Sequence, residues 1–242
     1  MYELIITEKP SAAKKIAEAL AEGKPIRETN QGVSYYKVTH QKKDIVVACA
    51  VGHLYSVAEK DPKGWTYPVF DISWKLSSEL SKDLAYSKKY YATIKKLAKE
   101  ADSFVVACDY DTEGEVIGLN CIRFICNQKD AARMKFSTLT TDELIESYEN
   151  KAPRLNWGQA LAGETRHFLD WLYGINLSRA LSLSVKSFGN GHKVLSIGRV
   201  QGPALKIVVD REEEIGKFVP EPFWQLQLTG TAHDKPLEAW HE

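Results

Sequence analysis

The stretch FVVACDYDTEGE, residues 104–115, decides the fold of this 242-residue chain. Its first part, 104–108, is a continuous apolar run, which is typical of a strand buried on both faces of a parallel sheet. An acidic loop follows directly, and a helix is predicted over 116–126. This order predicts an α/β unit whose ligand site lies at the carboxyl end of the strand.

The N-terminus has the same order of elements. Residues 2–7 form a short apolar strand, the turn Glu8-Lys9-Pro10-Ser11 follows, and a helix is predicted to about residue 22. Further elements are predicted as strands at 33–38 and 45–51, a loop at 61–73, helices at 87–100 and 141–149, and a candidate strand at 133–137. The alternation predicts a doubly wound α/β domain over 1–152, with a mainly parallel sheet flanked by helices.

The sequence pattern changes after Pro153. The segment 153–218 is predicted to be mostly helical, with helices at 162–185 and 200–214. From 219 to 242 apolar and polar residues alternate around the turn HDKP, which predicts a hairpin at the start of a β-rich domain. Since a hairpin alone is only marginally stable, we expect further domains beyond residue 242.

Composition limits the classes of function. Lys plus Arg number 32 and so do Asp plus Glu, which argues against a protein that simply coats DNA but permits an enzyme with separate acidic and basic regions. The four cysteines, Cys49, Cys108, Cys121 and Cys126, form no pair of CxxC motifs, so we expect no zinc site and a reduced, cytoplasmic protein. No apolar run approaches the roughly 20 residues that span a bilayer, so we expect no membrane partner.

The acidic loop predicts a metal site. Asp109 and Asp111 alternate on extended backbone and should share a face, Glu113 follows, and Glu8 occupies the end of the first strand. If the two strands are neighbours, four carboxylates converge, and they need a cation because they repel one another. Oxygen ligands select a hard ion, so Mg²⁺ is expected, with Mn²⁺ as a substitute, bound together with a substrate phosphate.

Simpler interpretations exist for each of these residues. A DxDxE string also occurs as a solvated turn or in a calcium loop, although the further ligand spacing of a calcium loop is missing. Glu8 and Lys9 also suit the start of a helix. His53 is either a phosphate contact or a structural hydrogen-bonding residue.

Five motifs resemble those of a known family. TEKPSAAKKIA at 7–17, VGHL at 51–54 and DYDTEGE at 109–115 resemble the Toprim domain, which primases, some nucleases and topoisomerases share. AGETRHFLDWLYGINLSRAL at 162–181 and SIGRVQGPALKIVVDREEEI at 196–215 resemble the segment that follows Toprim in type IA DNA topoisomerases, closest to archaeal topoisomerase I and topoisomerase III.

The resemblance implies roles at the matching positions. Glu8 is then the general acid beside the scissile phosphate, Lys9 a phosphate contact, and Asp109, Asp111 and Glu113 the Mg²⁺ cluster. The resemblance also places Arg166, Asp170, Arg199 and Gln201 in the groove for single-stranded DNA, and side-chain chemistry adds His53 and Arg179 as expected DNA-binding residues. Two of these readings also follow from side-chain chemistry: Arg166 and Asp170 can pair at i,i+4, and the arginine fork of Arg179 or Arg199 matches a phosphate.

The implied activity is that of an ATP-independent topoisomerase. Such an enzyme breaks one DNA strand through a 5′-phosphotyrosine, passes another strand and reseals the break, acting on single-stranded DNA in the chromosome. The family's YxRT tyrosine context is absent from these 242 residues, so the chain alone is predicted to be inactive in cleavage. Two alternatives remain: a Toprim nuclease or primase-like phosphotransferase, and a non-catalytic DNA-binding module.

Overall fold

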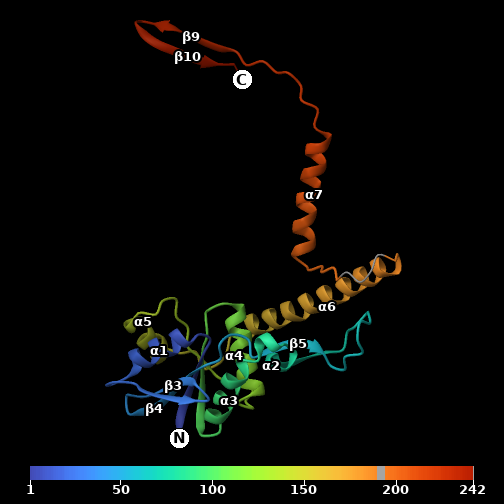
Figure 1. Ribbon diagram of the computed structural model, residues 1–242. Coiled ribbons are helices and arrows are strands. Elements are labelled where there is room, and N and C mark those ends of the chain that lie inside the picture. The colour runs from blue at the N-terminus through green and yellow to red at the C-terminus, as the bar shows by residue number, and fades with distance from the viewer. Residues whose placement is uncertain (190–193, 242) are drawn as a thin grey trace. The chain divides into compact units, whose positions relative to one another are not determined.

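The computed structural model describes residues 1–189 and 194–241, which form two compact units, Met1–Gly198 and Arg199–Glu242 (Figure 1). The first unit contains a six-stranded sheet in the order β2-β3-β4-β1-β7-β8. Its strands are β1 (Tyr2–Thr7), β2 (Ile26–Asn30), β3 (Val33–His40), β4 (Lys43–Cys49), β7 (Ala101–Ala107) and β8 (Ala132–Arg133). Strands β4, β1, β7 and β8 run parallel, and β2 and β3 complete the sheet in antiparallel pairing, which confirms the mainly parallel α/β fold.

Helices cover both faces of this sheet (Figure 1). They are α1 (Pro10–Leu20), α3 (Ser87–Ala98), α4 (Thr112–Phe124) and α5 (Thr141–Glu149). Along β1, Ile5 packs with residues of α1 and α5, whereas Leu4 and Ile6 pack with residues of α3 and α4. Neighbouring side chains of a strand point to opposite faces, so a strand that is apolar throughout needs a helix layer on each side.

Several elements differ from the sequence-based expectation. Strand β2 and the hairpin of β5 (Tyr55–Glu59) with β6 (Ile72–Leu76) were not predicted. Strand β2 has a single apolar residue, and β5 and β6 have five residues each and are separated by a stretch rich in Pro and Gly that is typical of a loop. Two short helical turns follow the hairpin, α2 (Ser77–Leu80) and the 3₁₀ helix η1 (Lys82–Leu84). Helix α4 begins at Thr112, four residues before the predicted start, because the side chain of Asp111 caps it by accepting a hydrogen bond from the Gly114 amide at 2.7 Å.

The long helix α6 (Trp157–Ser187) packs directly on α4. Gly163 makes this close approach feasible: a Cβ there would lie 2.8 Å from the carbonyl oxygen of Thr112 and 2.5 Å from the side chain of Val116. Glu164, one residue on, accepts hydrogen bonds from Trp74 and Arg123, so α6 is tied to both β6 and α4.

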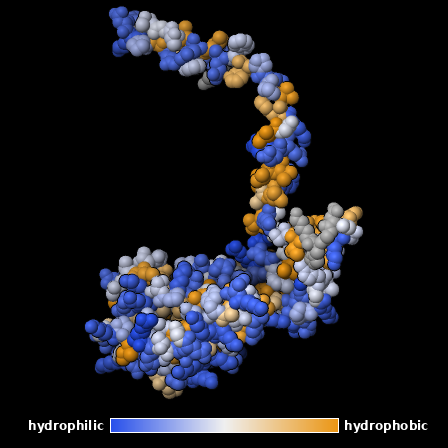
Figure 2. Space-filling model, viewed as in Figure 1, coloured by the Kyte–Doolittle hydropathy of each residue, from blue (hydrophilic) through white to orange (hydrophobic). Residues whose placement is uncertain are grey.

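The second unit consists of α7 (Gln201–Lys217) and an antiparallel hairpin of β9 (Gln227–Ala232) and β10 (Lys235–Trp240). The predicted hairpin is confirmed. None of the side chains in these three elements is buried, and the surface of α7 carries apolar residues (Figure 2). Among the described helices, none has the length and apolar character required to cross a bilayer. The expected domain boundaries at 152 and 218 stay predictions.

A buried arginine fixes the end of β7. The guanidinium of Arg133 is fully buried; it donates to Glu115 Oε1 at 2.7 Å and to the carbonyl oxygens of Cys108 at 2.9 Å and Asp109 at 2.8 Å. A buried charge is tolerated only when it is paired and its donors are satisfied. Arg133 therefore joins β8, α4 and the first residues of the acidic loop into one rigid unit.

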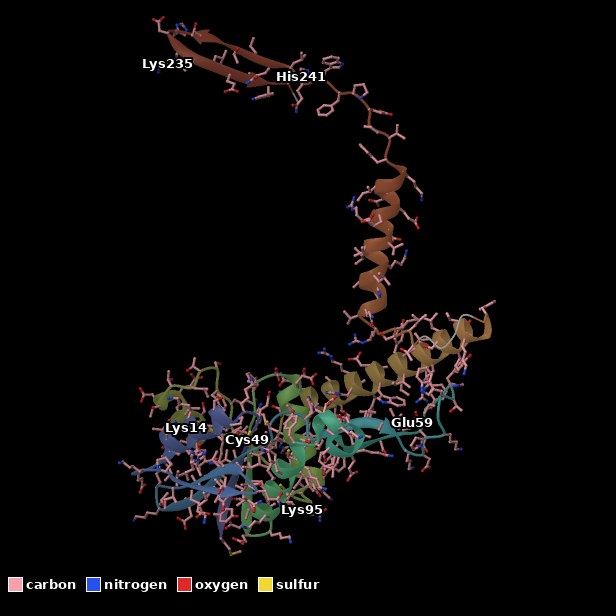
Figure 3. The ribbon with its side chains drawn as sticks, in the orientation of Figure 1. Lys14, Cys49, Glu59, Lys95, Lys235 and His241 are labelled. Carbon is pink, nitrogen blue, oxygen red and sulfur yellow. The ribbon has the colours of Figure 1, made fainter. Side chains whose placement is uncertain are left out.

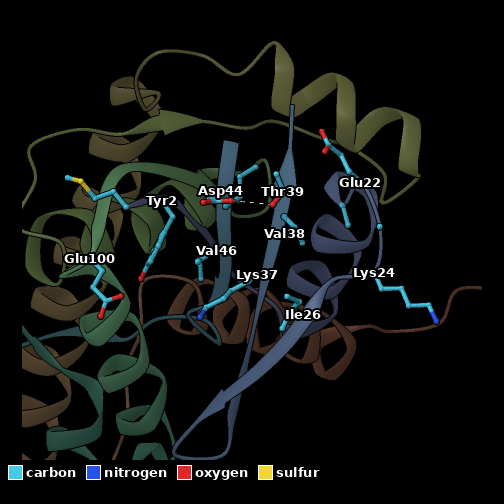
Figure 4. Close-up of a pocket in the computed structure, with 14 residues that line it drawn as sticks. Tyr2, Glu22, Lys24, Ile26, Lys37, Val38, Thr39, Asp44, Val46 and Glu100 are labelled. Carbon is cyan, nitrogen blue, oxygen red and sulfur yellow. Dashed lines mark hydrogen bonds between the residues drawn. The ribbon is translucent and has the colours of Figure 1, made fainter. Parts of the chain in front are cut away.

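A hollow of about 500 Å³ lies at the other end of the parallel strands (Figure 4). Tyr2, Asp44 and Glu100 line it together with residues of β2 and β3. The hollow lies at the amino ends of the parallel strands, whereas ligands of open α/β sheets bind at the carboxyl ends. It is therefore separate from the acidic loop.

Replacing Gly163 by alanine should weaken the packing of α6 on α4. The added methyl group meets a backbone carbonyl and a buried valine, so we expect a loss of about 1–3 kcal/mol in the free energy of unfolding, measured in urea. Gly158→Ala is the control in the same helix, because its Cβ would meet only Asn156 at 3.5 Å. Equal stability of the two variants would contradict the proposed close approach.

Replacing Arg133 by methionine should cost about 3–5 kcal/mol in the free energy of unfolding, because Glu115 stays buried without its partner. Arg133→Lys keeps the charge but not the fork of donors, so it should lose less and remain folded. Urea unfolding of both variants measures the difference. A methionine variant as stable as the parent chain would show that the pair does not hold this edge of the sheet.

Candidate functional site

The topology places two strand ends side by side. Thr7 of β1 is paired with Ala107 of β7, and the chain then leaves β1 toward the β4 side and β7 toward the β8 side. Glu8 and Asp109 therefore follow neighbouring strands at the point where the strand order reverses. This is where open α/β sheets form a ligand crevice.

A third loop closes the same edge of the sheet. After β4, the backbone amides of Ala50 and Gly52 donate to the carbonyl oxygens of Thr7 and Glu8 at 2.8 and 3.2 Å. Val51 and Gly52 have φ angles of 57° and 83°. A β-branched residue in this left-handed region costs roughly 1–3 kcal/mol and is commonest at functional sites. This turn leads the chain directly into His53.

Each aspartate of the acidic loop has its own partner. Asp109 accepts a hydrogen bond from Lys9 Nζ at 2.5 Å, and Asp111 caps α4 at Gly114. A Cβ on Gly114 would lie 2.1 Å from the Asp109 carbonyl oxygen, so only glycine permits this tight turn. The loop is therefore held by Lys9, by its own helix and by Arg133.

The negative charges of both aspartates act on the carboxyl of Glu8. Burial and the charges of Asp109 and Asp111 raise the pKa of Glu8, and Lys9, whose Nζ lies 3.9 Å from the carboxylate, opposes them only in part. The hydrogen bond to Asp109 and the nearby carboxylates raise the pKa of Lys9, so it remains a cation. The crevice thus combines the carboxyl of Glu8, which holds its proton more firmly than an ordinary glutamate does, with the charged ammonium group of Lys9.

Glu113 faces a different set of residues. Its Oε2 lies 2.8 Å from Nε2 of His167 and 3.0 Å from Nε2 of His53, and its Oε1 lies 3.8 Å from Arg166. Burial alone would raise the pKa of Glu113, but hydrogen bonds and charge from the two histidines lower it. Burial and the neighbouring His167 lower the pKa of His53. Glu113 therefore contacts α6 and the turn after β4.

The structure brings together only part of the predicted metal cluster. No three of Glu8, Asp109, Asp111 and Glu113 have ligand atoms within 4.8 Å of one another, and the set that does so among the described residues is His53, Glu113 and His167. Glu113 was expected to converge with the other carboxylates from a loop, but it lies in the first turn of α4, which begins at Thr112. Glu8, Asp109 and Asp111 still present only oxygen donors in one crevice, which fits a hard divalent ion.

The expected DNA contacts are in different environments. Arg166 and Asp170 form the predicted i,i+4 pair at 3.6 Å on the exposed side of α6. Arg179 is mostly buried; it donates to the carbonyl of Thr66 at 2.9 Å and pairs with Glu59 of β5 (Figure 3), so it ties α6 to the hairpin. Arg199 and Gln201 belong to the second unit, at the start of α7.

Two residues of the site were not singled out from the sequence. His167 follows Arg166 directly, but its contact with Glu113 joins positions 54 residues apart, and nothing local indicates it. Arg133 stood only at the start of a candidate strand. A lone arginine between apolar residues is a weak signal of burial, because arginine is rarely buried without a partner.

Comparisons with known proteins identify the family of this chain. A family model of the Toprim domain matches residues 3–139, and a model of the DNA topoisomerase family matches 154–242. DNA topoisomerase 1 of Pyrococcus furiosus is 47% identical over 99% of this chain and 23% of its own length. DNA topoisomerase 3 of Vibrio cholerae is 33% identical over 93% of this chain and 35% of its own length.

The fold comparison gives the same answer. Full-length topoisomerase I from Thermotoga maritima superposes with a TM-score of 0.59 at 25% identity, over 93% of this chain and 32% of that one. The chain thus spans about a quarter to a third of the length of these relatives. It belongs to the Toprim family and carries, in order, the Toprim domain and the following region of a type IA DNA topoisomerase.

Proposed function

We propose that this chain is the metal-binding and strand-binding part of an enzyme that breaks and rejoins one strand of DNA without ATP. The observation that supports the proposal best is the pairing of β1 with β7, which sets Glu8 and Lys9 beside Asp109 at one strand end. Acid, cation and metal ligands are the groups that a phosphodiester transfer requires.

Glu8 acts as the general acid. Its raised pKa keeps a larger protonated fraction near neutral pH than an ordinary glutamate would have, and the proton goes to the oxygen that leaves the broken phosphodiester. Lys9 contacts the phosphate as a cation, in exchange for its hydrogen bond to Asp109. These two residues need no movement of the sheet to act together.

Toprim domains bind a divalent metal, and we propose Mg²⁺ here, with Mn²⁺ as a substitute. Asp109 and Asp111 would hold it, with Glu113 as the third candidate ligand. When bound, the ion neutralises phosphate charge and orients the phosphate. Arg133 keeps the backbone of the acidic loop in place, so the two aspartates act as ligands on a rigid support.

Single-stranded DNA is the proposed partner. Arg166 and Asp170 lie on the exposed side of α6, close to Glu113, and we propose that they and His53 contact the strand. In the second unit, Arg199 and Gln201 are proposed strand contacts in their own right. The covalent step requires a tyrosine, and none of the eleven tyrosines stands in a YxRT context. In this proposal, the tyrosine that cleaves the strand comes from outside these residues. Strand passage likewise depends on further domains.

Mg²⁺ should strengthen the binding of a single-stranded oligonucleotide, measured by fluorescence anisotropy. The variant Asp109→Asn/Asp111→Asn should lose this dependence, because amides bind Mg²⁺ more weakly than carboxylates do. Arg166→Ala should lower the slope of log affinity against log salt by about 0.7, the value for one phosphate contact. Lys95→Ala, on the outer side of α3 (Figure 3), is the matched control and should change nothing.

Two results would contradict the proposal. Affinity unaffected by Mg²⁺ in every variant would favour a non-catalytic DNA-binding module. Mg²⁺-dependent cutting of the oligonucleotide by this chain would favour a Toprim nuclease.

The carboxyl of Glu8 should titrate above its ordinary pKa of 4.5 in NMR, and Asp111→Asn should lower its pKa by removing a negative charge. Because the folded-state pKa is raised, the chain should lose stability as pH rises from 4.5 through the raised value. Glu8→Gln should abolish that loss. A Glu8 pKa at or below 4.5 would contradict the role of general acid.

A further inference from the structure

We propose that His53, Glu113 and His167 form a second metal site, for a zinc-like transition ion rather than for magnesium. The ligand atoms are Nε2 of each imidazole and Oε2 of the carboxylate, all within 4.8 Å of one another. The absence of paired CxxC motifs argues against a zinc site built from cysteines, and it says nothing about a site built from histidines.

The distances suit a small ion. Oε2 of Glu113 lies 2.8 and 3.0 Å from the two imidazole nitrogens. Zinc ligands at about 2.1 Å in tetrahedral geometry are roughly 3.4 Å apart, so these two nitrogen–oxygen pairs need to open by only about half an ångström. Two imidazoles and one carboxylate form a three-ligand zinc set that leaves one position open.

Three separate elements hold the ligands in place. His53 follows the left-handed turn that is bonded to β1, Glu113 lies in the first turn of α4, and His167 lies on α6. The two imidazole rings meet edge to face with centroids 4.8 Å apart, and Trp74 packs against His167. The side chains are 27%, 36% and 28% exposed, so an ion can reach them from solvent.

The bound ion is expected to be exchangeable. Metal-binding histidines usually donate their second ring nitrogen to an outer partner, which raises affinity 10–100-fold. Nδ1 of His53 is buried and has no such partner among the described residues. The site therefore differs from a closed structural zinc site, which has four protein ligands.

An ion at this site would have two effects. It would join α6 to the turn after β4, and it would engage Glu113. Only the second effect rests on the proposed function: a zinc-like ion would keep Glu113 away from the magnesium ligands and so inhibit metal-dependent strand binding.

Cobalt(II) is a direct probe, because its visible absorption is strong when few ligands surround it and weak when six do. Titration of the 242-residue chain with Co²⁺ should produce strong absorption that added Zn²⁺ removes. His53→Gln and His167→Gln should each lower the Co²⁺ affinity more than about 10-fold, since losing a ligand costs at least as much as losing an outer partner.

Two controls separate this site from the others. His40→Gln removes a histidine that lies 3.4 Å from Glu149, a single carboxylate, and should leave Co²⁺ binding unchanged. Asp111→Asn keeps the cap of α4, because asparagine caps as well as aspartate does. It should therefore retain Co²⁺ binding while weakening Mn²⁺ binding, measured by electron paramagnetic resonance.

Weak six-coordinate absorption, or strong absorption that persists in both histidine variants, would overturn the second site. A rise in the thermal midpoint with Zn²⁺, lost in His167→Gln, provides an independent readout. Failure of Asp111→Asn to affect Mn²⁺ would instead count against the proposed magnesium ligands and leave the second site standing.

Discussion

Arg133 fixes the acidic loop at the carboxyl end of β7, on which the rest of the site depends. Its guanidinium is fully buried and donates to Glu115 and to the carbonyl oxygens of Cys108 and Asp109, which directly follow β7. Burying an arginine is unfavourable unless each donor finds an acceptor, so the loop cannot shift without leaving donors unsatisfied. With that edge fixed, the pairing of β1 with β7 is enough to bring Glu8 and Lys9 beside Asp109.

The charges at the site are divided among several partners. Lys9 binds Asp109, the first turn of α4 holds Asp111, and two histidines hold Glu113. Burial and the charges of Asp109 and Asp111 raise the pKa of Glu8, and Lys9 offsets them only in part. This division explains how several acids can coexist in one crevice, and it makes Glu113 one of the residues that join α6 to the Toprim domain, beside Glu164 and Arg179.

The sequence predicted the strands and helices with strong apolar patterns and the meeting of Glu8 with Asp109, because parallel strands end at a common edge. It did not predict the side on which Glu113 lies. The side chain of Asp111 caps α4, so the helix begins before the first residue of its apolar pattern and includes Glu113. Nor did it predict His167, Arg133 or the use of Arg179 as a tether to Glu59, because these contacts join distant positions. Local periodicity carries no information about such pairs.

The central claim is that Asp109 and Asp111 share one divalent ion with a DNA phosphate that lies beside Glu8. A crystal structure of this chain with Mn²⁺ and a single-stranded oligonucleotide tests it most directly, because the anomalous signal of manganese locates the ion. The account predicts manganese bound by Asp109 and Asp111, with a phosphate oxygen in its shell and Glu8 beside that phosphate. Manganese bound elsewhere, or Glu8 turned away from the phosphate, would contradict it.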